Sequence, residues 1–176
     1  ANYDNSIFLC IGTGVGAAVI HDGKMIEPDD VPGFEFSHTI IQKDGELCNC
    51  GKSGCFETYA SLKRFKQKIS DKFGLNTLSG KIIREFINQN PDNEILNNMI
   101  KEYIEYLSIG ISNIINIFEP DVICIGGSFA EYENIFKQPL EKALVEGNLL
   151  FNKRDKIFIK HAKLKNDAGI IGATLI

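Results

Sequence analysis

The residues best suited to chemistry lie in one polar stretch, HTIIQKDGELCNCGKSGCFE, at positions 38–57. One histidine and three cysteines follow the pattern H-x9-C-x-C-x4-C: His38, Cys48, Cys50 and Cys55. Zinc is held tetrahedrally by imidazole nitrogens and thiolate sulfurs, so these four side chains form a complete ligand set. Gly51 and Gly54 allow the tight turns that bring three sulfurs onto one ion. We therefore predict a zinc site here.

A site with four protein ligands leaves no position for a metal-bound water, so we expect this zinc to be structural. The alternative, three reduced cysteines without a metal, fits poorly in so polar a loop. Disulfides are disfavoured because three is an odd number and no export signal is visible in ANYDNSIF. The remaining cysteines, Cys10 and Cys124, lie in apolar runs, and we expect them to be small buried hydrophobes.

Two glycine-rich segments could bind phosphate or a nucleoside. The first, CIGTGVGAAVI, contains Gly12, Thr13 and Gly14 but enters strand-like sequence and lacks Gly-Lys-Ser/Thr, so it is neither a Rossmann fingerprint nor a P-loop. We interpret it as a turn between two strands whose amides could hold a phosphate, with a hairpin turn that binds nothing as the alternative. The second, Gly126-Gly127, ends an apolar strand before a helix, where open α/β sheets bind ligands.

The elements that position these residues alternate between strand and helix patterns. We predict strands over 6–12, 16–27, 121–127 and 156–160, and helices over 57–71, 79–90, 92–120, 133–147 and 167–176. An Asp-Gly turn at 22–23 makes a hairpin of the second strand region, and Pro139 is expected to kink or break its helix. A loop as long as 28–55 is usually functional or held in place by specific contacts, and we expect the cysteines to supply those contacts. This order indicates an α/β fold.

Composition narrows the classes of function. The chain has 176 residues, a size for one domain or half of a two-lobed protein, and begins with Ala, so we interpret it as a piece of a longer protein. Its formal charge is −4 with no basic stripe, which argues against nucleic-acid binding through this segment. No apolar run is long enough to span a membrane. Reduced cysteines and a metal site favour the cytoplasm.

Five segments in order resemble the C-terminal half of the ROK family of sugar kinases, repressors and related open reading frames: IGTGVGAA, FEFSHTII, CNCGKSGCFETYAS, DVICIGGSF and NDAGIIGATLI. The resemblance runs from about Ser6 to Ile176. It implies the second lobe of an actin-like, ribonuclease-H-like ATPase, with a central sheet flanked by helices. Residues 1–176 would form a single domain, the C-terminal lobe of a two-lobed protein, with the zinc and sugar loop 28–57 inserted.

The resemblance also implies roles for particular residues. Gly12, Thr13 and Gly14 match the second phosphate loop, which faces ATP, and Gly126 and Gly127 match the adenosine motif. Glu35, His38 and Glu57 match residues that contact sugar hydroxyls, with His38 also a zinc ligand. Carboxylates suit this role because they accept hydrogen bonds from hydroxyls, and a metal-bound imidazole has a fixed ring. Taken singly, Glu35 reads as a solvated loop residue and Glu57 as an acid favoured at a helix N-terminus.

Two departures from the family pattern matter. Ser37 stands where the motif has glycine, at a cost if the backbone there needs a positive φ. The catalytic Asn-Asp-x-Asn motif and the first phosphate loop are absent from these residues, and we assign no such role to Asp4-Asn5. No catalytic residue is therefore predicted in this chain.

We predict the C-terminal lobe of an ATP-dependent, glucokinase-like hexose kinase, a phosphotransferase with an alcohol acceptor. The intact protein would use MgATP, a hexose or N-acetylhexosamine and a structural Zn²⁺, while this piece alone would be inactive. The alternative is the sugar-sensing effector domain of a ROK-type transcriptional repressor. As in many family members, a cytoplasmic homodimer is expected.

Overall fold

The computed structural model describes residues 3–27, 35–146 and 158–161. The helix expected over 167–176 and most of the loop before residue 35 lie outside the described residues.

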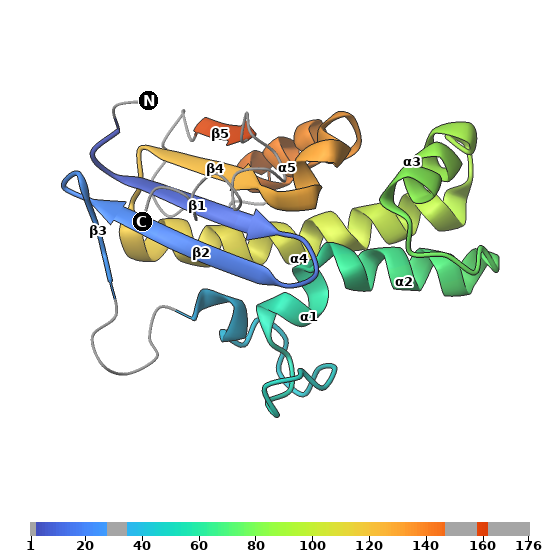
Figure 1. Ribbon diagram of the computed structural model, residues 1–176, viewed down its shortest axis with the longest axis horizontal. Helices are drawn as coiled ribbons and strands as arrows, with labels where there is room; N and C mark the ends of the chain where they lie inside the picture. The colour runs from blue at the N-terminus through green and yellow to red at the C-terminus, as the bar shows by residue number, and fades with distance from the viewer. Residues whose placement is uncertain (1–2, 28–34, 147–157, 162–176) are drawn as a thin grey trace.

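A five-stranded mixed sheet forms the centre of the fold (Figure 1). Its strands are β1 (Ser6–Ile11), β2 (Val15–His21), β3 (Lys24–Met25), β4 (Val122–Gly126) and β5 (Phe158–His161), in the order β3-β2-β1-β4-β5. β1 pairs antiparallel with β2 and parallel with β4, and β5 continues the parallel half. The Asp22-Gly23 turn, with φ values of 49° and 72°, joins β2 to β3 and confirms the predicted hairpin.

Helical segments begin within the metal-ligand loop and follow it along the chain. They are η1 (Phe36–His38), α1 (Phe56–Ala60), α2 (Leu62–Phe73), α3 (Gly80–Gln89), α4 (Glu94–Phe118), η2 (Gly127–Tyr132) and α5 (Glu133–Glu146). In Figure 1 the long α4 runs along one face of the sheet, and α2 and α3 extend beyond the ends of its strands. The expected α/β class is confirmed.

The single helix predicted over 57–71 is wrong, because the chain breaks between α1 and α2 at Ser61. This residue is buried and extended, with φ −67° and ψ 134°. The Ala60 carbonyl at the break accepts a hydrogen bond of 2.9 Å from the buried hydroxyl of Tyr103. A hydrogen bond from a distant side chain therefore replaces the backbone hydrogen bond that this carbonyl would accept in a continuous helix. Pro139 lies inside α5 without ending it, so of the expected kink or break the break does not occur.

The core lies between the sheet and α4. Alternate residues of β1, among them Ile7, Leu9 and Ile11, are buried in it. The intervening Cys10 is exposed and Cys124 half-buried, so the expectation that both are buried hydrophobes is wrong. The cause is the two-residue period of a strand, which turns Cys10 away from the face that α4 covers.

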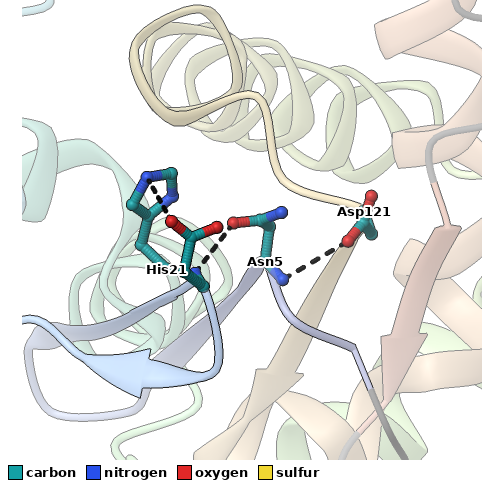
Figure 2. Close-up of polar contacts among 4 residues, drawn as sticks. Asn5, His21 and Asp121 are labelled. Atoms are coloured by element: carbon teal, nitrogen blue, oxygen red, sulfur yellow. Dashed lines mark hydrogen bonds and ion pairs between the residues drawn. The ribbon is translucent and has the colours of Figure 1, made fainter.

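Polar contacts tie three chain segments together where β1 begins (Figure 2). The Asn5 backbone amide donates to Asp121 Oδ2 at 3.3 Å, and the Asn5 side-chain oxygen accepts from the Asp22 amide at 3.2 Å. His21 Nε2 lies 3.9 Å from a carboxylate oxygen of Asp22. Asn5 thus holds the start of β1 to β4 and to the β2–β3 turn, at the opposite end of β1 from Gly12. Asn5 therefore has a structural role.

Candidate functional site

The four predicted metal ligands converge. The ligand atoms of His38, Cys48, Cys50 and Cys55 lie within 4.8 Å of one another. Cys48 Sγ lies 3.6 Å from His38 Nδ1, and Cys50 Sγ lies 3.5 Å from Cys55 Sγ. Tetrahedral zinc, with Zn–S near 2.3 Å and Zn–N near 2.0 Å, requires separations of about 3.5 to 3.8 Å between neighbouring ligand atoms. These residues fit zinc, with Nδ1 as the histidine donor.

Short backbone bridges hold this loop. Ile40 pairs with Cys55 and Leu47 with Ser53, which folds the segment back on itself. Gly54 makes the fold possible, because its φ is 83° and an added Cβ would lie 1.8 Å from the Gln42 carbonyl oxygen. Only glycine fits there. The turns that the sequence predicted in this loop are therefore present.

The thiols of the cluster influence each other's ionisation. Burial tends to raise the pKa of the Cys48 thiol, but hydrogen bonds from the Cys50 backbone and from neighbouring side chains outweigh it and lower the pKa to about 6. Burial is the main cause at Cys55, and with the adjacent thiols it raises the pKa of Cys55 to about 12. One thiolate forms readily and a further one is unfavourable without a cation. Metal binding is therefore expected to release protons.

The three predicted sugar contacts come from segments that the loop brings together. Glu35 immediately precedes η1 and is exposed, and His38 is the last residue of η1. Glu57 lies in the first turn of α1, which is joined to η1 by the 2.9 Å hydrogen bond from the Phe56 amide to the Thr39 carbonyl. The end of η1 and the start of α1, which carry His38 and Glu57, are therefore bonded to each other through the main chain.

Ser37, in place of the family glycine, has no strained backbone. Among the described non-glycine residues, the positive φ values are at Asp22, Asp44, Asn76 and Glu119. Ser37 is buried inside η1. The neighbouring Phe36 packs edge-on against Phe118, with ring centroids 5.2 Å apart, and anchors η1 to the end of α4. A serine therefore fits this backbone without the cost that a positive φ would impose.

Glu57 also contacts the glycine turn, which the sequence did not reveal. Its Oε2 accepts a hydrogen bond of 3.0 Å from the Val15 amide. A Cβ built on Gly14 would lie 2.4 Å from the same oxygen, so glycine is needed for this approach. The carboxylate predicted to bind sugar therefore touches the turn predicted to face phosphate, although 42 positions separate the two bonded residues.

Some backbone amides of the glycine turn, residues 12–14, donate no hydrogen bond to the described part of the protein. The Gly12 amide donates to the Gly14 carbonyl at 2.9 Å, and the Gly12 carbonyl accepts from the Lys63 amide at 3.1 Å. Within the described part of the chain, the amides of Thr13 and Gly14 have no protein acceptor. A cavity of about 320 Å³ adjoins the turn and is lined by Thr13, Cys48, Asn49, Glu57, Thr58, Ser61, Lys63, Arg64 and Gln67. This cavity lies between the loop of candidate metal ligands and the turn.

The second glycine pair lies beside the first glycine turn. β1 and β4 are parallel, so both strands end at the same edge of the sheet, and a Cβ on Gly12 would lie 3.4 Å from Ser128 Oγ. Gly127 has φ 71°, and a Cβ there would lie 2.7 Å from the Ile11 carbonyl oxygen. Gly127 is thus required by the chain's own packing, whatever it offers to a nucleoside.

Helix α3 holds the segment that follows Gly127, a contact that the sequence did not indicate. Arg84 of α3 pairs with Glu131 and stacks over the ring of Tyr132, whose hydroxyl donates to the Gly80 carbonyl at 3.0 Å. Nothing in the local pattern joins these residues, because 47 positions separate the ion pair.

Comparison with known proteins finds similarity to proteins named as sugar kinases and as repressors. A sequence profile of the ROK family matches residues 1–176. The glucokinase of Thermotoga maritima is 26% identical over 99% of this chain and 58% of its own length. The xylose repressor of Caldicellulosiruptor bescii is 28% identical over 94% of this chain and 44% of its own length. The chain thus spans about half the length of these relatives.

Solved structures of ROK proteins also resemble this chain. The ROK glucokinase of Streptomyces griseus, in complex with glucose and AMPPNP, superposes with a TM-score of 0.83 at 25% identity, over 98% of this chain and 60% of that one. A ROK transcriptional regulator homologous to the Escherichia coli MLC protein superposes with a TM-score of 0.80 at 24% identity, over 98% of this chain and 45% of that one. Of the helices described here, none has the length and apolar character of a membrane span. The chain belongs to the ROK family, and its fold is the α/β, actin-like ATPase fold of ROK sugar kinases.

Proposed function

We propose that residues 1–176 are the C-terminal sugar-, zinc- and nucleotide-binding lobe of an ATP-dependent hexose kinase, with the loop 28–57 inserted in a single domain. In the intact protein the γ-phosphate of MgATP passes to a hydroxyl of a hexose or N-acetylhexosamine. The Thermotoga maritima glucokinase, which is 26% identical, and the Streptomyces griseus structure that holds glucose and AMPPNP support this reaction class.

The observation that carries the proposal is the contact between Glu57 and the glycine turn. A phosphoryl transfer needs the acceptor hydroxyl and the terminal phosphate within bonding reach. The 3.0 Å hydrogen bond from the Val15 amide to Glu57 Oε2 fixes a sugar-contacting carboxylate against the turn whose free amides face the phosphates. Sugar and phosphate therefore meet at the cavity that both Thr13 and Glu57 line.

Within this site the chain's residues bind and orient. Glu35 and Glu57 accept hydrogen bonds from sugar hydroxyls, and His38 turns Nδ1 to the thiols so that its ring orientation is fixed. Gly12, Thr13 and Gly14 face the phosphates, while Gly126 and Gly127 lie at the neighbouring strand end on the nucleoside side. Zinc, when bound by its four ligands, stabilises the loop and supplies no step of the reaction. The base that deprotonates the hydroxyl belongs to the other lobe.

The test is an ATP-dependent phosphorylation assay of the full-length gene product across hexoses and N-acetylhexosamines. We expect turnover with at least one sugar, and loss of that turnover in Glu57→Gln and Glu35→Gln variants that still bind zinc. The present chain alone should give none, because it carries no catalytic aspartate motif. Absence of turnover with every sugar would overturn the proposal.

A second candidate is the effector domain of a sugar-responsive repressor, which the xylose repressor relatives and the MLC-like structure favour. The same Glu35, His38 and Glu57 would then sense a sugar without phosphorylating it. The region upstream in the gene decides between the two. A helix-turn-helix there identifies a repressor, and an Asn-Asp-x-Asn motif after a glycine loop identifies a kinase.

A further inference from the structure

The cavity beside the glycine turn has two cationic side chains that the proposed sugar contacts do not use. Lys63 and Arg64 line it together with Thr13 and Glu57. Across the described residues, neither cation takes part in an ion pair or a side-chain hydrogen bond. Lys68 of the same helix differs, since its ammonium pairs with a carboxylate 3.0 Å away. Unpaired cations at a cavity wall are available to a ligand.

A main-chain hydrogen bond fixes Lys63 against the turn. The Lys63 amide donates to the Gly12 carbonyl at 3.1 Å, so the first turn of α2 is bonded directly to the glycine turn. Arg64 follows about 100° further around the helix and extends the positive wall of the cavity. The one carboxylate of the lining, Glu57, already accepts a hydrogen bond from the Val15 amide.

The chemistry of this wall matches a phosphate. Phosphate oxygens are bound most strongly by charge-assisted hydrogen bonds from Lys and Arg, and free backbone amides in a turn complete such a site. Here the two side chains face the same cavity as Thr13, whose amide and that of Gly14 have no acceptor among the described residues. A neutral sugar alone would leave both charges unpaired.

We propose that Lys63 and Arg64 bind a phosphate group held over the Gly12–Gly14 turn. The inference rests on the proposed function for the source of that phosphate, which is either a phosphate of the bound nucleotide or the phosphate of a phosphorylated sugar. The two residues thereby set the charge of the ligand that the cavity accepts.

The test compares three forms of the zinc-loaded full-length protein: the unchanged protein, the double variant Lys63→Ala/Arg64→Ala, and the control Lys72→Ala. Lys72 is an exposed cation of α2 that does not line the cavity. Inorganic tripolyphosphate, ADP and a sugar phosphate are titrated by calorimetry. We expect the double variant to bind at least one of them about ten-fold to a hundred-fold more weakly, the loss typical of charged hydrogen bonds. The control should bind as the unchanged protein does.

The pattern of losses identifies the source of the phosphate. Weaker ADP and tripolyphosphate binding with unchanged sugar-phosphate affinity assigns the nucleotide, and the reverse assigns the sugar. A charge-retaining Lys63→Arg/Arg64→Lys variant should recover most of the affinity, which separates a binding role from a folding defect. Unchanged affinity for all three ligands in a folded double variant overturns the inference while the kinase proposal stands. Loss of tripolyphosphate binding in a protein without kinase turnover leaves the inference and removes the kinase proposal.

Discussion

Replacing Gly14 by alanine tests the contact that joins the zinc loop to the glycine turn. The added Cβ would lie 2.4 Å from Glu57 Oε2, far inside van der Waals distance. The backbone itself accepts alanine, because Gly14 is not among the described residues with positive φ. The carboxylate must therefore withdraw, and the Val15 amide loses the acceptor that it now reaches at 3.0 Å.

The expected cost follows from that one hydrogen bond. A hydrogen bond to a charged partner stabilises a protein by about 1.5 to 3 kcal/mol. Glu57 is only half-buried, so water replaces part of the interaction, and we expect a fall of about 1.5 kcal/mol in the free energy of unfolding. Alanine also lowers the entropy of the unfolded chain, which offsets about 0.4 to 1 kcal/mol. Gly16→Ala is the matched control, because a Cβ at Gly16 meets nothing within 4 Å.

Urea unfolding of the zinc-loaded chain measures the difference between the two variants. A double-mutant cycle then tests whether this difference in stability arises from the Glu57 contact. In a Glu57→Ala background, Gly14→Ala should lower the free energy of unfolding by no more than Gly16→Ala does. Zinc content should be the same in Gly14→Ala and Gly16→Ala, since both glycines lie outside the ligand loop. If Gly14→Ala is equally destabilising with and without the Glu57 side chain, the reasoning about this contact is wrong.

Three further predictions concern the metal, the second glycine pair and alkaline stability. Cys50→Ser should reduce bound zinc from about one per chain and lower stability. Cys10→Ser, which lies outside the cluster, should leave the measured zinc content unchanged. Equal zinc content in the two variants would contradict the site. Gly127→Ala should destabilise the chain by more than about 1 kcal/mol, because it combines a φ of 71° with a Cβ 2.7 Å from a carbonyl oxygen; a melting temperature equal to that of the unchanged chain would count against it. Burial raises the pKa of Tyr103, so above about pH 10 the unfolded chain loses a proton that the folded chain keeps, and stability falls with rising pH. Urea unfolding at pH 9 and 11 should show a smaller fall for Tyr103→Phe, and an equal fall would show that another group is responsible.

The metal cluster and the hairpin were predictable because their causes are local. His38 and the three cysteines lie within 18 consecutive residues, and the glycines between the ligands indicate the tight turns that join them. The Asp-Gly turn between β2 and β3 likewise depends on the φ preferences of two adjacent residues. The order of strand and helix patterns was enough for the α/β class. The family resemblance, carried by five short motifs, added the fold and the expected roles of Glu35 and Glu57.

Tertiary structure decided what depends on contacts between distant positions. The periodicity of residues 57–71 fits one helix, yet Ser61 interrupts it because Tyr103, 43 positions from Ala60, supplies a partner for the carbonyl at the break. Cys10 has an apolar neighbourhood in sequence but faces away from the core, since exposure in a strand depends on which face another element covers. The bond between Glu57 and the Val15 amide leaves no local pattern at all. A sequence specifies which atoms can bond, and the folded chain determines which of them meet.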